Sequence, residues 1–178
     1  TPLADLEAQR ILEREKRDVT IIDLDFHEKT VQSVASSLKE SLKHARNCTH
    51  LGVGQALVKE LASNRRYVND DGKVMHNRMS ATRDAKLREY AEGTIDPWLK
   101  TLSFWDGEQA VAAISAYATH PMSYYCTGKV SADFPGLARG RRQADDAKMT
   151  QIYISGCSGN ITAGKFNDGS PQNRPILA

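Results

Sequence analysis

Two apolar runs on either side of the dipeptide Asp106-Gly107 constrain the fold of this chain more than any other feature. Together they form the stretch "WLKTLSFWDGEQAVAAISAYAT", residues 98–119. Asp-Gly readily takes the positive φ values of a tight turn between antiparallel strands. We therefore predict a β-hairpin in this part of the chain.

Other segments add helices and short strands to the hairpin. Thr30 can cap a helix over 31–45, where apolar residues follow the i, i+3, i+4 spacing of an amphipathic helix. Residues 3–17 are rich in Leu, Ala, Glu and Arg, which favours an exposed helix or a docking arm. Short strands are expected at 19–26 and 151–155.

Long loops are expected between these elements, above all at 64–84 and 156–178, which are polar and rich in turn-forming residues. The predicted fold is α/β, of the α+β kind, with strands interspersed with a few helices. Loops this long are unusual in a small domain, so either they build a site or further sequence completes the domain.

Composition bounds the broad class of protein. The 178 residues are 40% hydrophobic, which favours one domain with its own core, residues 1–29 being a candidate N-terminal arm. The formal charge of +2 gives no electrostatic reason to expect nucleic acid as a partner. No apolar run approaches the ~20 residues of a membrane span, and the N-terminus lacks the pattern of a signal peptide.

Clustered arginines and scattered cysteines give weaker signals. The cluster "RGRR" at 139–142 is typical of a solvated loop and hints only weakly at an anionic partner. Cys48, Cys126 and Cys157 lack metal-type spacing, and their odd number leaves at least one thiol outside any intramolecular disulfide.

His120 follows the second apolar run of the hairpin and precedes Pro121, which stops further strand pairing. Functional sites are commonly built at the end of a strand. A neutral imidazole is a good zinc ligand, but zinc needs three or four donors, and none lies near His120 at ligand spacing. From local sequence, a hydrogen-bonded structural histidine is favoured over a ligand.

Ser158 lies in the turn "GCSGN", residues 156–160, directly after the expected strand. Small residues let the backbone turn sharply, and neighbouring N–H groups could stabilise an oxyanion. The sequence is not the nucleophile elbow G-x-S-x-G, because Asn160 stands at its last position. A turn without chemical role and a packed Cys157 are the alternatives.

Two further positions carry charged candidates. Arg65 follows Asn64, and its guanidinium could bind a carboxylate or phosphate, although such an arginine is more often a surface residue. Asp133, with Ser131, could fix the turn that leads into Leu137, which favours a capping role.

Four segments, taken in order, resemble the neutral/alkaline non-lysosomal ceramidase family, specifically its bacterial members. They are "SNRRYVNDDGKV", "IDPWLKTLSFWDGEQAVAAISAYATHPMSYY", "KVSADFPGLAR" and "ISGCSGNITAGKFNDG". The resemblance covers residues 30–178, and its specificity lies in the succession of the four motifs. It implies part of a catalytic domain with stacked, mostly β sheets flanked by helices.

The resemblance also implies residue roles. His120 matches a zinc-ligand histidine, Ser158 falls where the family has its catalytic serine, and Arg65 matches an active-site arginine. The implied activity is zinc-dependent hydrolysis of the amide bond of ceramide or a related lipid amide. The implied location is secreted, periplasmic or at a membrane surface.

Some family features have no counterpart. The His-Thr-His motif is missing upstream of Thr30, and Gly-Cys-Ser-Gly-Asn replaces the family's Asp-Val-Ser-Pro-Asn around Ser158. The family's glutamate and tyrosine zinc ligands lie well beyond its serine loop, so the other ligands are expected outside these residues, in a companion segment. The alternatives are a non-catalytic ceramidase-like binding or structural module and, more distantly, a serine hydrolase without metal.

Overall fold

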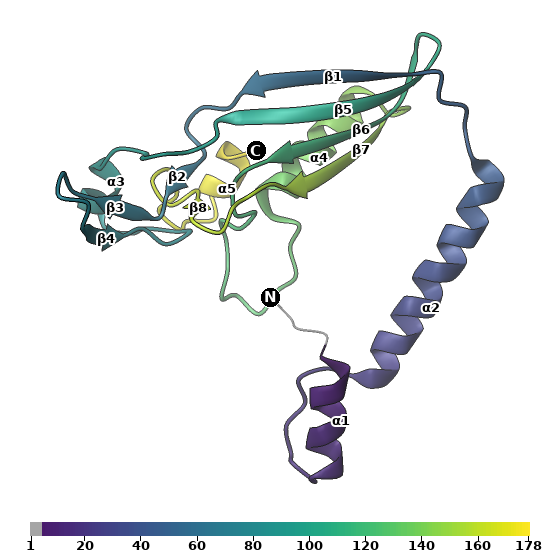
Figure 1. Ribbon diagram of the computed structural model, residues 1–178, viewed down its shortest axis with the longest axis horizontal. Helices are drawn as coiled ribbons and strands as arrows, with labels where there is room; N and C mark the ends of the chain where they lie inside the picture. Colours follow the sequence, from purple (N-terminus) through teal and green to yellow (C-terminus); the bar gives the residue numbers. More distant parts are fainter. Residues whose placement is uncertain (1–4) are drawn as a thin grey trace. The chain divides into compact units, whose positions relative to one another are not determined.

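The computed structural model describes residues 5–178. The chain divides into two compact units, Thr1–Arg46 and Asn47–Ala178, and each is described by itself (Figure 1). Within the part described, no helix combines the length and the apolar character that crossing a bilayer requires.

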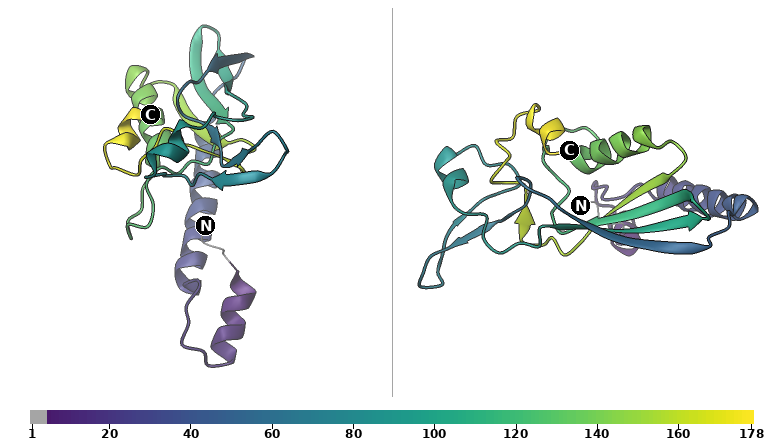
Figure 2. Two further views of the ribbon diagram at one scale, coloured as in Figure 1. Left: turned by 90° about the vertical axis from the view of Figure 1, so that its left-hand side faces the viewer. Right: turned by 90° about the horizontal axis from the view of Figure 1, so that it is seen from above.

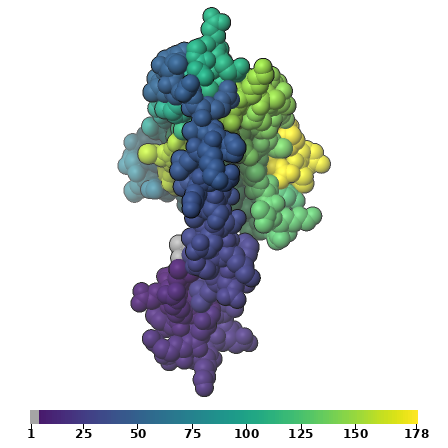
Figure 3. All heavy atoms as spheres, turned by 90° about the vertical axis from the view of Figure 1, so that its right-hand side faces the viewer, coloured from purple at the N-terminus to yellow at the C-terminus, as the bar shows by residue number. Residues whose placement is uncertain are grey.

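The first unit consists of α1 (Leu6–Arg14), α2 (Leu24–Ser41) and the 3-10 turn η1 (Leu42–His44). The buried side chain of Gln9 accepts a hydrogen bond of 2.8 Å from the backbone N–H of Ile21, which fastens the connection between the helices to α1. None of the side chains of α2 is buried, and Figure 3 shows them on the surface along the helix.

Two predictions for this unit are wrong. Residues 19–26 do not form a strand, because Asp23 caps α2 by accepting a 2.9 Å hydrogen bond from the backbone N–H of Phe26. The helix therefore begins before Thr30. Thr30 lies within the helix, and its hydroxyl donates a hydrogen bond of 2.7 Å to the backbone carbonyl of Phe26.

The second unit is built on a four-stranded sheet with the order β1-β5-β6-β7. The strands are β1 (His50–Leu57), β5 (Trp98–Asp106), β6 (Gln109–Tyr117) and β7 (Thr150–Ser155). β1, β5 and β6 are antiparallel neighbours, whereas β7 runs parallel to β6. The predicted hairpin is confirmed as β5 and β6, with Gly107 at φ +56° in the turn.

The connection from β6 to the parallel strand β7 contains α4 (Asp133–Asp145), which the sequence analysis did not predict. This helix packs against one face of the sheet (Figure 2). The largest buried cluster of apolar side chains lies on this side of the sheet and comprises Leu61, Ala62, Tyr117, Phe134, Ala163 and Leu177.

The opposite face of the sheet carries apolar side chains that are only partly covered. Cross-strand pairing places Val53, Leu102, Ile114 and Ile152 in one row. Val53 and Ile152, at the two ends of this row, are 88% and 42% exposed, whereas Leu102 and Ile114 are half-buried. The sheet therefore has one covered and one open apolar face within the described residues.

The expected loops contain small elements of their own. The segment 64–84 holds the second residue of β2 (Ser63–Asn64) and all of β3 (Arg66–Val68) and β4 (Val74–Asn77). β2 pairs with β8 (Ile161–Thr162) from the second expected loop. The remaining elements are the short helices α3 (Ala85–Glu89) and α5 (Asn173–Ile176). The mixed α+β prediction is confirmed, but these loops are more structured than the sequence suggested.

Candidate active site

The short strand β8 brings together the three candidate residues that lie far apart in the sequence. The backbone N–H of Arg65 donates 2.8 Å to the carbonyl of Asn160, directly before β8. The backbone N–H of His120 donates 2.9 Å to the carbonyl of Ile161, the first residue of β8. The segments carrying His120, Arg65 and the turn with Ser158 therefore meet at one place.

His120 lies after the end of β6, and its side chain is half-buried. Its backbone carbonyl accepts a hydrogen bond of 2.8 Å from Met122. Its ring has no hydrogen-bond partner among residues 5–178, which differs from the hydrogen-bonded structural histidine considered from sequence. The imidazole nitrogens are therefore not engaged by the rest of the described chain.

The turn with Ser158 is fixed at both ends. The backbone N–H of Gly156 donates 2.8 Å to the carbonyl of Tyr117, and the carbonyl of Ser158 accepts 3.1 Å from Ile161. Ser158 is half-buried, whereas the neighbouring Cys157 is exposed with a free thiol. The packed cysteine considered from sequence is therefore not seen, and the serine stands on a short, anchored turn.

Arg65 is half-buried, and its Nη2 atom approaches the sulfur of Met79 at 3.4 Å. A thioether sulfur is only a weak acceptor. Within residues 5–178 no carboxylate lies within 4.0 Å of this guanidinium. The donors of Arg65 are thus available to an anionic group.

A hydrogen-bond network between Asn160, Asn64 and Arg66 was not expected from the sequence. The Asn160 side-chain oxygen accepts 2.9 Å from Arg66 Nε, and its amide nitrogen donates to the side-chain oxygen of Asn64. The same Asn64 oxygen accepts 2.9 Å from the backbone N–H of Arg66. These contacts hold the chain on both sides of Arg65 against the serine turn.

Arg78 supports this network from beneath and is 1% exposed. Its guanidinium donates to the carbonyls of Tyr90, Ala91 and Asn64 at 2.8, 2.7 and 2.9 Å. Its backbone N–H donates 2.6 Å to the carbonyl of Arg65. Burial lowers the pKa of Arg78, and the nearby Glu92 carboxylate opposes that shift. Sequence alone does not separate this arginine from its exposed neighbours.

Two buried polar residues hold the segment after His120. Asp133 accepts hydrogen bonds of 2.9 and 3.1 Å from the backbone N–H groups of Ser123 and Tyr124. The amide of Asn167 donates 2.7 Å to the carbonyl of Ser123. Ser131 and Asp133 fix the turn before Leu137, since the Asp133 N–H donates a hydrogen bond of 3.0 Å to the Ser131 hydroxyl. The predicted capping role is wrong, because Asp133 is the first residue of α4 and the cap, Ala132, makes no side-chain hydrogen bond.

A depression of about 460 Å³ adjoins the serine turn and is lined by Gly156, Cys157 and Ile161 together with residues of β5 and β6. Lys100 and Asp96 lie in it with their charged atoms 2.6 Å apart. The hydrogen bond from the Lys100 side chain, followed by that from the Trp98 backbone, lowers the pKa of the Asp96 carboxyl. The depression reaches the start of the turn at Gly156 and Cys157, but Ser158 does not line it.

The described residues do not form a zinc centre by themselves. No group of three or more His, Cys, Asp or Glu side chains in residues 5–178 could hold a metal ion together. His120 supplies one imidazole, whereas a zinc site needs three or four donors.

Comparisons with known proteins give likenesses to two solved structures. No protein-family model matches the chain, and no curated protein matches it. Among solved structures the chain is similar to a neutral ceramidase from Pseudomonas aeruginosa, with 20% identity and a TM-score of 0.49. It is also similar to a ceramidase complexed with C2, with 21% identity and a TM-score of 0.49. Each likeness covers 71% of this chain and 20% of the other, so the chain spans about a fifth of their length.

Proposed function

We propose that this chain forms part of a zinc-dependent amidase of the neutral ceramidase type. Its substrate would be ceramide or a related lipid amide. The observation that carries the proposal is the meeting of three sequence motifs around β8, where Arg65 contacts Asn160 and His120 contacts Ile161 through backbone hydrogen bonds. Each motif alone is weak evidence for an active site. A shared active site requires the three motifs to be neighbours in the fold, and their segments are neighbours at β8.

Each candidate has a role in this proposal. Ser158 is the nucleophile that attacks the amide carbonyl, and Arg65 stabilises the oxyanion with a guanidinium that has no carboxylate partner in the described chain. His120 offers one imidazole to zinc. The buried residues Arg78 and Asn167 act as positioning residues for the loops that carry these groups.

The remaining zinc ligands would come from a companion segment outside these residues. One histidine does not make a catalytic zinc site, which keeps three protein ligands and one open position. The proposal therefore assigns His120 to a shared centre and assigns no complete centre to this chain.

Zinc content measured by elemental analysis tests the role of His120. The proteins are the wild type, His120→Ala and the matched control His44→Ala, whose histidine is exposed in the turn η1. With the companion segment present, and after equilibration with zinc and removal of the excess, we expect more zinc on the wild type and on His44→Ala than on His120→Ala. Equal zinc content in all three proteins would show that His120 is not a zinc ligand.

The second candidate function is a non-catalytic lipid-binding module, which the exposed apolar sheet face around Val53 favours. Flotation with ceramide-containing vesicles separates the two candidates. Binding that is equal with and without a chelator, and equal in His120→Ala, together with no zinc on the wild type, would support the module.

A further inference from the structure

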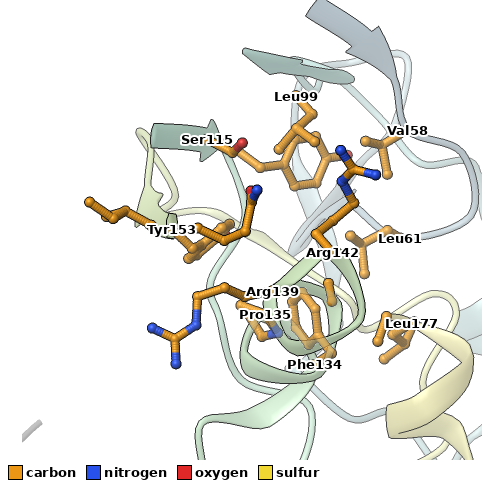
Figure 4. A pocket seen from close by; sticks show the side chains of 15 residues that line it. Val58, Leu61, Leu99, Ser115, Phe134, Pro135, Arg139, Arg142, Tyr153 and Leu177 are labelled. Carbon is orange, nitrogen blue, oxygen red and sulfur yellow. The ribbon is translucent and has the colours of Figure 1, made fainter. Parts of the chain in front are cut away.

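A cavity of about 200 Å³ lies between α4 and the covered face of the sheet. Its wall is mostly apolar, with contributions from Val58, Leu61, Leu99, Phe134 and Leu177 (Figure 4). Neither His120, Ser158 nor Arg65 lines it, so it is separate from the candidate active site. Protein interiors are usually filled to close-packed density, so a space of this size beneath a helix calls for an explanation.

One tyrosine gives this cavity a polar group without a partner. Tyr117 and Tyr153 both line the cavity, and the Tyr117 hydroxyl is buried with no hydrogen-bond partner in residues 5–178, whereas the Ser155 side chain lies beside the Tyr153 hydroxyl. Tyr117 is only 2% exposed. Buried polar groups are nearly always paired, so an unpaired hydroxyl in an apolar cavity indicates a ligand with acceptor atoms.

An arginine places a positive charge beside the cavity. Figure 4 shows the Arg142 side chain extending toward Val58 and Leu99, whereas the Arg139 side chain extends the opposite way. Arg142 approaches the Asp145 carboxylate only at 3.5 Å, and both side chains are more than 60% exposed, at 64% and 67%. Such an exposed pair is weak, so a ligand anion could displace Asp145.

We propose that this cavity binds a carboxylate with an unbranched aliphatic chain, such as a medium-chain fatty acid. The aliphatic chain would lie among Leu61, Leu99 and Leu177. The carboxylate would pair with Arg142, because the planar fork of a guanidinium matches the two carboxylate oxygens. The hydroxyl of Tyr117 is the further donor available to it.

This binding site does not depend on the proposed amidase. It needs neither zinc nor a nucleophile, and it uses residues of α4 and the sheet that the proposed active site does not. If the zinc experiment fails, the proposed carboxylate site still stands. If the carboxylate site fails its own test, the amidase proposal still stands.

Isothermal titration of the full chain with decanoate, below its micelle concentration, tests the proposal. We expect saturable binding with one decanoate per chain. Decanol and decyltrimethylammonium, which keep the aliphatic chain but not the negative charge, should bind more weakly. If either binds as tightly as decanoate, the carboxylate is not recognised and the proposal is overturned.

Two variants on α4 test which arginine binds the carboxylate of the ligand. Arg142→Gln should weaken decanoate binding about tenfold, the scale of one charge-assisted contact. The matched control Arg139→Gln should change it less than about twofold, because Arg139 also lines the cavity but its guanidinium extends away from that of Arg142. Equal weakening by both would mean unspecific attraction to a basic surface and would overturn the site.

A third variant tests the cavity itself. Ala138 lines the cavity, so Ala138→Phe should fill it and abolish binding of decanoate in protein whose circular dichroism is unchanged. Unchanged affinity in this variant would place the binding elsewhere, for example on the open sheet face, and would overturn the proposal. If the variant does not fold, the comparison of Arg142→Gln with Arg139→Gln still decides.

Discussion

The backbone N–H of Arg65 donates a hydrogen bond of 2.8 Å to the carbonyl of Asn160, although the hairpin β5–β6 and the helix α4 separate the two residues in sequence. This contact continues the pairing of β2 with β8 by one residue. It puts a guanidinium-bearing segment beside the turn that carries Ser158. The following predictions test the contacts that maintain this arrangement.

Asn160→Ala should destabilise the protein and loosen the segment at Arg65. The substitution removes the acceptor of Arg66 Nε and the amide donor to Asn64. We expect a loss of about 1–3 kcal/mol in the free energy of unfolding, measured in urea, because polar groups lose their partners. The Arg65 amide should also exchange faster with deuterium. Asn77→Ala, at an exposed position of β4, is the control, and an equal loss there would contradict the prediction.

Arg78→Lys should fail to replace the buried arginine. One guanidinium serves the carbonyls of Asn64, Tyr90 and Ala91, and a single ammonium group lacks the fork that reaches all of them. We expect losses of about 3 kcal/mol or more for Arg78→Lys and Arg78→Met alike, since buried carbonyls stay unpaired.

The control for Arg78 is Arg83→Met, because Arg83 is exposed. It should change the free energy of unfolding by less than about 0.5 kcal/mol. If lysine restores the stability of the wild type, the fixed geometry of the guanidinium is not what Arg78 contributes.

Gly164→Ala should be strongly destabilising, whereas Gly159→Ala should be neutral. A Cβ atom at Gly164 would lie 1.9 Å from the backbone carbonyl oxygen of Met79, and a backbone atom cannot simply move away. At Gly159 a Cβ atom meets nothing within 4 Å. Thermal unfolding should show a cost of about 3 kcal/mol for the first substitution and almost none for the second. Similar melting temperatures would refute the close approach of Gly164 to Met79.

Tyr117 should make stability fall at high pH. Burial, and then the charges of Glu92 and Asp96, raise its pKa to about 12. The unfolded chain has the ordinary tyrosine pKa of about 10, so the folded state holds the proton more tightly. Stability from this group is therefore complete below about pH 10 and is lost as the pH rises toward 12.

Tyr117→Phe isolates this effect from the titration of lysines. The difference in free energy of unfolding between wild type and variant should change by about 1–3 kcal/mol over that pH range. At pH 7 the variant should be as stable as the wild type or slightly more stable, because the hydroxyl has no partner in residues 5–178. A constant difference at all pH values would contradict the raised pKa.

Local sequence patterns were sufficient to predict elements that depend on interactions between neighbouring residues. Asp106-Gly107 indicated the hairpin, because a turn of this kind depends on two adjacent residues and their φ values. The predicted strand at 151–155 is confirmed as part of β7, which spans Thr150–Ser155. The cap at Thr30 was wrong because Asp23 is also a good capping residue, and the helix begins about two turns earlier, at about 3.6 residues per turn.

Contacts between residues far apart in the sequence could not be predicted from such local patterns. Asn160 reaches Asn64 only because β2 and β8 pair, and neither two-residue strand has a periodicity that could predict it. Arg78 looks like any surface arginine in a polar segment, yet the fold buries it beneath backbone carbonyls. The helix α4 was missed because it is short of apolar residues and its buried face depends on the sheet beneath it.

The α+β class, the central hairpin, and His120, Ser158 and Arg65 as candidates could be predicted from adjacent residues and ordered motifs. The fold added what those patterns do not contain: the segments of the candidates meet at β8, Asn160 and Arg78 support them, and a cavity lies beneath α4. Burial and hydrogen-bond partners depend on which distant segments pack together, and no local pattern encodes that pairing.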